Sequence, residues 1–210
     1  APVIPSSASD RDVVLVLDVS GSMYGTPLEE TKKASINFIS TVLQEGARIS
    51  VVAFANDAQV VSDFSTDETV LVNAVNGLDT YGGTNTEAGL RSAQLLLSGS
   101  AAKKKIIVLM SDGEPNNGRV GDDLIAYADS IKQQDILIYT LGFFESLSNK
   151  APAQALMNAL ASDGCHYEVS DADSLVFFFE DIADQINGQR YIYIRIACPV
   201  DVTIRYGGET

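Results

Sequence analysis

The sequence predicts an α/β fold with a doubly wound, mostly parallel sheet that is flanked by helices on both faces. Short runs of apolar, often β-branched residues recur along the chain, and longer segments between them carry apolar residues at three- and four-residue intervals. The short runs are typical of strands buried on both faces, and the longer segments are typical of amphipathic helices. Strands that alternate with helices usually form a parallel sheet covered on both sides.

The predicted strands with almost uninterrupted apolar sequence are residues 13–18, 49–54, 106–110 and 136–141. Two weaker patterns predict an edge strand and a further short strand, at residues 60–64 and 167–169. The predicted amphipathic helices are residues 28–43, 86–97, 122–134, 152–161 and 174–186.

The pattern divides the chain of 210 residues into three parts. Residues 1–10 are rich in Pro and Ser, which predicts a flexible leader. Residues 11–188 contain the alternating strands and helices and suit one large domain. Residues 189–210 instead show two adjacent strand patterns, at 191–197 and 200–206, with no helix between them. They are interpreted either as a short β appendage or as the start of a second, β-rich domain.

The negative charge of the chain disfavours two classes of partner, nucleic acids and anionic membranes. A net charge of −14 and a pI near 4.3 disfavour binding to nucleic acid and to anionic membrane surfaces, because like charges repel. No apolar run approaches the roughly 20 residues that a membrane-spanning helix needs. No signal peptide is visible at the N-terminus, which has neither a basic start nor a long apolar stretch.

The end of the first predicted strand carries the clearest chemical signal. It continues as Asp18-Val-Ser20-Gly21-Ser22, so that one carboxylate and two hydroxyls at spacings of two can converge within a tight loop. In open α/β sheets, ligands bind at the carboxyl ends of the strands. An acidic residue that closes an apolar strand is costly unless it is paired or coordinates a cation. Small oxygen donors of this kind suit Mg²⁺, Mn²⁺ or Ca²⁺.

Two further segments are predicted to face the same crevice. The strand at 106–110 ends in Ser111-Asp112-Gly113, and a glycine-rich loop, Tyr81-Gly-Gly-Thr84-Asn-Thr, precedes the helix at 86–97. Asp112 would supply a second carboxylate, and Thr84 a third hydroxyl. The predicted metal ligands are therefore Asp18, Ser20, Ser22, Thr84 and Asp112.

The motifs Asp-x-Ser-x-Ser, Gly-Gly-Thr and Ser-Asp-Gly, in this order, closely resemble those of the von Willebrand factor A (VWA) domain. The resemblance extends from about Asp10 to Gly188 and implies a metal-ion-dependent adhesion site. It implies that Ser20, Ser22 and Thr84 are direct ligands, and that Asp18 and Asp112 act directly or through water. It further implies that a protein partner supplies an Asp or Glu to a Mg²⁺ ion (or Mn²⁺ or Ca²⁺). The expected function is a non-enzymatic, adhesion-type module, extracellular or on a cell surface.

Two other functions remain open at this point. One is a Mg²⁺-dependent phosphotransferase or hydrolase with Asp18 as nucleophile, although position 20 is Ser where the haloacid dehalogenase pattern has a second acid. His166, the single histidine, has no plausible catalytic partner set and is interpreted as structural. The other is an intracellular VWA subunit of an ATPase-linked complex.

Two side chains outside the motifs also lead to expectations. Glu87 follows the threonine loop and is interpreted as a first-turn helix charge. Cys165 and Cys198, the two cysteines, could form an intrachain disulfide that fastens the β tail to the main domain. Such a bond would indicate an oxidising compartment. The alternative is two unrelated, partly buried thiols.

Overall fold

The computed structural model describes residues 10–44, 46–111, 115–144, 150–169 and 172–187. The predicted β tail and all of the predicted leader except Asp10 lie outside these residues, so the predicted division of the chain into three parts stays a prediction. Among the described residues, none of the helices combines the length and the apolar character needed to cross a membrane.

A six-stranded sheet in the order β3-β2-β1-β4-β5-β6 forms the centre of the molecule. Five strands are parallel, and β3 pairs antiparallel with β2 at one edge. This confirms the predicted fold class. The strands are β1 (Arg11–Asp18), β2 (Arg48–Phe54), β3 (Ala58–Ser65), β4 (Lys104–Ser111), β5 (Ile136–Phe143) and β6 (His166–Val169).

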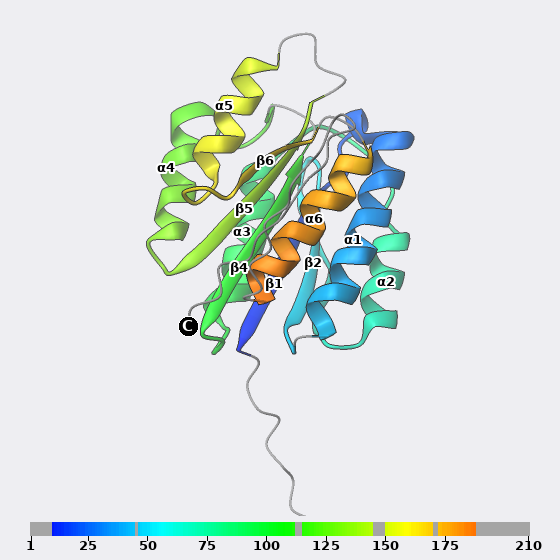
Figure 1. The fold of residues 1–210 in the computed structure, drawn as a ribbon. Coiled ribbons are helices and arrows are strands. Elements are labelled where there is room, and N and C mark those ends of the chain that lie inside the picture. The colour runs from blue at the N-terminus through cyan, green and yellow to red at the C-terminus, as the bar shows by residue number, and fades with distance from the viewer. Residues whose placement is uncertain (1–9, 45, 112–114, 145–149, 170–171, 188–210) are drawn as a thin grey trace, which may run out of the picture.

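Helices cover both faces of the sheet, as Figure 1 shows. One face carries α1 (Thr26–Gln44), α2 (Glu68–Asn76) and α6 (Ala172–Asn187). The other face carries α3 (Thr86–Ser98), α4 (Gly121–Lys132) and α5 (Ala151–Leu160). A short 3₁₀ helix, η1 (Gly21–Met23), follows β1.

The alternation of side chains along each strand produces two separate hydrophobic cores. On β1, Val13, Leu15 and Leu17 pack into the core beneath α1, α2 and α6, whereas Val14 and Val16 pack into the core beneath α3, α4 and α5. Successive residues of a strand point to opposite faces, so a strand covered on both sides is apolar at most of its positions. This explains why β1 reads as a continuous apolar run.

The sequence did not predict α2. Its nine residues are rich in Val, which favours strands, and the segment is short for a helix. The helix begins at Asp67, whose side chain accepts hydrogen bonds from the amides of Thr69 and Val70. Leu71 and Val75, four residues apart, are its buried side chains, so the tertiary contact decides the structure of this segment.

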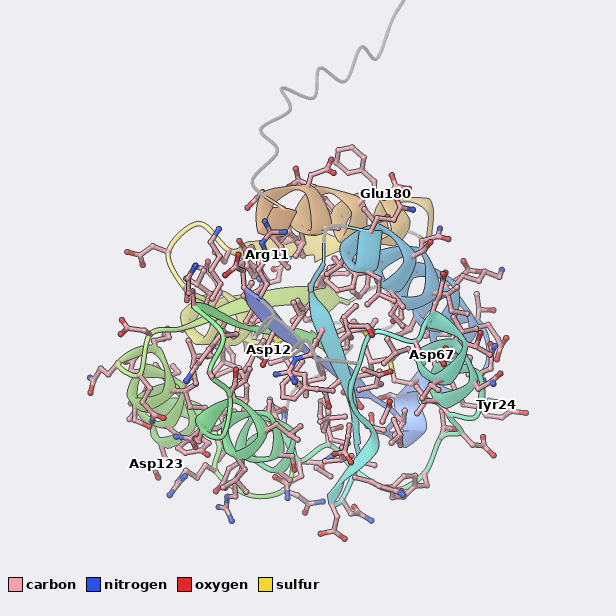
Figure 2. All side chains as sticks on the ribbon, turned by 90° about the horizontal axis from the view of Figure 1, so that it is seen from below. Arg11, Asp12, Tyr24, Asp67, Asp123 and Glu180 are labelled. Atoms are coloured by element: carbon pink, nitrogen blue, oxygen red, sulfur yellow. The ribbon has the colours of Figure 1, made fainter. Side chains whose placement is uncertain are left out.

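A partly buried ion pair joins β1 to β2 at the amino ends of the strands. Asp12 is fully buried and accepts two hydrogen bonds from Arg48, of 2.9 Å from Nε and 2.6 Å from Nη2. The Ser100 hydroxyl also donates to it. Figure 2 shows Asp12 between the two helical layers. The pair satisfies a buried carboxylate at the edge of the sheet opposite to the predicted metal ligands.

Candidate metal centre

Asp18 closes β1 at the carboxyl edge of the sheet and is fully buried. Its Oδ1 accepts the amide of Ser20 at 2.8 Å, and its Oδ2 accepts the hydroxyl of Ser111 at 2.5 Å. Ser111 is the last residue of the neighbouring strand β4. The carboxylate is therefore held in orientation from its own loop and from β4. The sequence interpretation missed the role of Ser111.

Ser20 and Ser22 bring two hydroxyls to the same loop. Their Oγ atoms lie 3.1 Å apart. Ser20 is buried, with 1% of its surface exposed, whereas Ser22 is exposed. The turn of η1 produces this arrangement, because the amide of Met23 donates to the carbonyl of Ser20 at 3.0 Å. The predicted convergence of Asp18, Ser20 and Ser22 is present.

The loop that carries Thr84 is hydrogen bonded to the loop after β1. The amide of Gly21 donates to the carbonyl of Gly82 at 3.0 Å, and the amide of Tyr81 donates to the carbonyl of Val19 at 2.9 Å. Thr84 is 4% exposed. Gly82 has φ +63°, and a Cβ there would lie 2.4 Å from Nδ2 of Asn56, so only glycine fits this turn. Thr84 thus belongs to the same edge as the two serines.

Asparagines from two other loops hold the backbone around Thr84. The amide of Thr84 donates to Asn116 Oδ1 at 2.9 Å, and its carbonyl accepts from the amides of Asn116 at 2.9 Å and Asn117 at 3.2 Å. In the turn between β2 and β3, Asn56 Oδ1 accepts from the amide of Gly83 at 2.8 Å. Four loops therefore meet at this edge, and their main chains fix one another.

The fifth predicted ligand, Asp112, lies outside the described residues, directly after Ser111. Within the described part of the chain, no group of three or more His, Cys, Asp or Glu side chains is placed to hold a metal ion. The described donor set consists of one carboxylate and three hydroxyls. Hydroxyl and carboxylate oxygens are donors that a hard cation such as Mg²⁺ accepts, so these residues fit such an ion.

Exposed aromatic side chains flank the two main loops. Tyr24, which follows η1, is 80% exposed, and Tyr81 in the threonine loop is 48% exposed. Figure 2 shows the Tyr24 side chain directed away from the molecule. Large exposed aromatic residues beside a polar site are typical of surfaces that bind other proteins.

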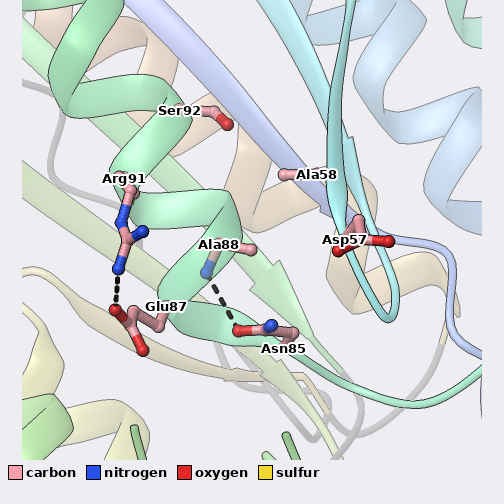
Figure 3. A pocket seen from close by; sticks show the side chains of 7 residues that line it. All are labelled: Asp57, Ala58, Asn85, Glu87, Ala88, Arg91 and Ser92. Carbon is pink, nitrogen blue, oxygen red and sulfur yellow. Dashed lines mark hydrogen bonds and ion pairs between the residues drawn. The ribbon is translucent and has the colours of Figure 1, made fainter. Parts of the chain in front are cut away.

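A polar pocket lies beside the threonine loop, between the β2–β3 turn and α3 (Figure 3). Asp57 and Ala58 line one side, and Asn85, Glu87 and Arg91 line the other. Glu87 is only 8% exposed and contacts Arg91 and Arg119. Glu87 lies in the first turn of α3, as the sequence predicted, and it also joins that helix to Arg119.

His166 and Cys165 lie away from this edge of β1. His166 begins β6, which β4 and β5 separate from β1, and its Nδ1 is 2.8 Å from Thr140 Oγ1. Cys165 is partly buried against the core beneath α6. Cys198 lies outside the described residues, so the disulfide stays a prediction.

Residues 12–185 match the model of the von Willebrand factor type A domain. The chain belongs to this family. Among relatives of this VWA domain, the minor fimbrium subunit Mfa5 of Porphyromonas gingivalis is 36% identical over 110 residues, which cover 49% of this chain and 9% of that protein. Human inter-alpha-trypsin inhibitor heavy chain H3 is 27% identical over 202 residues, which cover 88% of this chain and 22% of that protein. The chain thus spans less than a quarter of either relative.

Solved structures share the fold of this VWA domain. The vWF domain of the type V pili tip protein Mfa5 from Porphyromonas gingivalis superposes with a TM-score of 0.75 at 20% identity, covering 90% of this chain and 99% of that chain. The PilB minor pilin from Streptococcus sanguinis gives a TM-score of 0.74 at 20% identity, covering 89% and 63%. At this identity the likeness establishes the fold alone.

Proposed function

We propose that this VWA domain is a protein-binding module of the adhesion type, in which one divalent cation coordinates an acidic residue of a partner protein. The proposed cation is Mg²⁺, with Mn²⁺ or Ca²⁺ as substitutes. The proposed ligands are Asp18, Ser20, Ser22, Thr84 and Asp112. The single observation that carries this proposal is the meeting of the Asp18–Ser22 loop and the Thr84 loop at one edge of the sheet.

Each described side chain has a separate task in this proposal. Asp18 supplies charge, and the hydrogen bonds that it accepts from the Ser20 amide and the Ser111 hydroxyl hold the carboxylate in place. Ser20, Ser22 and Thr84 supply neutral oxygens. When bound, the cation supplies a positive centre with a coordination position open to a carboxylate. Two acids and three hydroxyls would barely neutralise a divalent ion, which favours an anionic group from the partner.

The names of the relatives support a surface role. Mfa5 is a fimbrium subunit and pilus tip protein, and PilB is a minor pilin. We propose by this likeness that the protein is extracellular or on a cell surface. Tyr24 and Tyr81 would then provide aromatic contacts around the cation, and the net charge of −14 favours a partner that is basic around its coordinating acid.

The geometry around Asp18 favours binding over catalysis. As a nucleophile, Asp18 would have to approach a substrate atom directly and leave the Ser20 amide and the Ser111 hydroxyl, whereas as a metal ligand it can act through water and keep both hydrogen bonds. His166, the only histidine of the chain, lies on the edge strand β6 and cannot serve Asp18 as a base. We therefore propose that the protein is not an enzyme.

Calorimetry with Mg²⁺ and Mn²⁺ tests the metal site. The wild-type protein is expected to bind one cation, and Asp112→Ala is expected to lose most of the affinity. Asp123→Ala, which removes an exposed acid on α4, is the matched control and should bind as the wild type does. Wild-type affinity in Asp112→Ala would exclude this assignment.

A pull-down from native extract, run with Mg²⁺ and again with EDTA, tests the partner. A protein that is retained only with Mg²⁺, and that is lost when its own Asp or Glu is replaced, is the expected result. Binding that survives EDTA would contradict coordination as the mechanism.

A further inference from the structure

We propose that Glu87 is a positioning residue for the metal centre, which holds the Thr84 loop in shape through residues 116–119 without touching the cation. Only the expected effect of Glu87 on metal affinity rests on the proposed function. The positioning role itself is a property of the protein without metal.

Glu87 joins α3 to the segment that precedes α4. Its carboxylate accepts the main-chain amide of Arg119 at 2.7 Å and pairs with the Arg119 guanidinium at 3.1 Å. Arg91, one turn further along α3, pairs with the same carboxylate (Figure 3). The Arg119 guanidinium also lies over the ring of Tyr127 on α4, 4.7 Å from its centroid. Residue 119 is thus fastened from α3 and from α4.

The burial of Glu87 separates it from an ordinary surface acid. The first-turn acids of α1 and α2, Glu29 and Glu68, are exposed, whereas Glu87 is 8% exposed. Desolvation alone would raise the pKa of Glu87. The hydrogen bonds from the Arg119 amide and from Arg91, with the charges of both arginines, outweigh it and lower that pKa. Glu87 therefore stays ionised, and a buried carboxylate with these partners defines the position of the chain that it binds.

The segment fastened by Glu87 is the one that holds Thr84. Asn116 and Asn117, respectively three and two residues before Arg119, occupy both main-chain hydrogen-bonding groups of Thr84. Asn117 Nδ2 also donates to Asn56 Oδ1 at 3.1 Å, and Asn56 in turn holds Gly83. A displacement of residue 119 would therefore also move Asn116 and Asn117, which are hydrogen bonded to the backbone of Thr84.

Close packing leaves this segment little freedom to shift. A Cβ at Gly83 would lie 2.5 Å from Asn116 Oδ1. Gly118 has φ +71°, and a Cβ there would lie 2.4 Å from Asn85 Oδ1 and 3.0 Å from Glu87 Oε2. Glycine at both positions lets the Thr84 loop and residues 116–119 approach each other closely. Glu87 lies against Gly118 in this contact. The main chain of Thr84 is thus held by a chain of contacts that begins at Glu87.

Amide hydrogen exchange in EDTA tests the positioning role without a metal. In Glu87→Ala, the amides of Thr84, Asn116, Asn117 and Arg119 are expected to exchange roughly 10-fold faster, because the ion pairs that fasten the segment are gone. Amides in the middle of β1, such as Leu15, should be unchanged. Glu87→Gln keeps an acceptor for the Arg119 amide and should show a smaller effect. Glu68→Ala, the loss of an exposed first-turn acid, should change none of them.

Calorimetry with Mg²⁺ on the same variants tests the consequence for the cation. The affinity of Glu87→Ala is expected to fall roughly 10-fold, as for other residues that support metal ligands, with Glu87→Gln between it and the wild type. Arg119→Ala should repeat the loss. Wild-type exchange at Thr84 and residues 116–119 in Glu87→Ala would overturn the positioning role, as would faster exchange throughout the sheet. Absence of Mg²⁺ binding by the wild type would instead overturn the proposed function and the link to the cation.

Discussion

Thr84 and Asn116 bind each other reciprocally: the Thr84 amide donates to Asn116 Oδ1 at 2.9 Å, and the Asn116 amide donates to the Thr84 carbonyl at 2.9 Å. A single asparagine thus satisfies both polar groups of the Thr84 main chain. Thr84 is nearly buried, so these groups could not turn to water instead. The reciprocal pair fixes the main chain of Thr84 at the carboxyl edge of the sheet.

Ser22→Ala separates metal binding from stability. Ser22 is exposed, so loss of its hydroxyl should change the free energy of unfolding in EDTA by less than about 0.5 kcal/mol. The Mg²⁺ affinity should fall by about 10-fold or more, since even residues outside the coordination sphere commonly change it that much. Calorimetry and urea denaturation measure the two effects. Ser98→Ala serves as the control, because it removes an exposed hydroxyl that donates to the Gln94 carbonyl within α3. Equal Mg²⁺ affinities of the two variants would exclude Ser22 as a ligand.

Arg48→Ala should destabilise the fold without affecting the cation. It leaves the fully buried Asp12 without its charge partner, which typically costs about 3–5 kcal/mol. We expect the lower end, because 40% of the Arg48 side chain is exposed. Urea denaturation measures the loss. Lys103→Ala breaks the exposed pair with Asp10 and should lower the urea midpoint far less than Arg48→Ala does. A change in Mg²⁺ affinity in Arg48→Ala would contradict the separation of the two edges.

His166 should make stability depend on pH between neutrality and weak acid. The Thr140 hydroxyl donates to the carbonyl of Met157, so it accepts from Nδ1–H of a neutral imidazole. Burial lowers the pKa of His166 below its ordinary 6.5 and outweighs the opposing charge of Glu168. The unfolded chain therefore binds a proton first as the pH falls. The stability that His166 contributes is complete above about pH 6.5 and is lost below it.

The measurement for His166 is the urea midpoint between pH 7.5 and pH 5. The midpoint of the wild type should fall with pH, and the midpoint of His166→Gln should fall less, because glutamine does not titrate. The carboxylates titrate at lower pH and contribute little in this range. Parallel pH profiles of the two proteins would show that His166 is not the group responsible.

The bond between Cys165 and Cys198 is tested by mass and by thiol labelling. Burial raises the pKa of the Cys165 thiol, so a free Cys165 in the folded protein would react slowly with a thiol label and could be mistaken for a bonded one. The protein must therefore be denatured before labelling and purified without reductant. We expect no labelled cysteine and a mass lower by two hydrogens than that of the reduced chain. Two labelled cysteines would exclude the bond and the argument from it for an oxidising compartment.

The predictions from the sequence succeed where the signal is local. The apolar runs of β1, β2, β4 and β5 identify buried strands, because a strand covered on both faces is apolar at most of its positions. Residues 60–64 also fall within the edge strand β3. The helix α2 was missed because it is stabilised by Asp67 and by the burial of Leu71 and Val75 rather than by its own composition.

The sequence by itself determined the alternation of strands and helices and the convergence of Asp18, Ser20 and Ser22, since a spacing of two within one loop limits how far these side chains can separate. Only the tertiary structure decided that Ser111 orients Asp18, that Asn116 holds Thr84 and that Glu87 fastens the segment beside them. These contacts join residues that are 93, 32 and 32 positions apart. Hydrogen bonds over such separations depend on the order of strands in the sheet and on which loops share its carboxyl edge, and neither leaves a pattern in the local sequence.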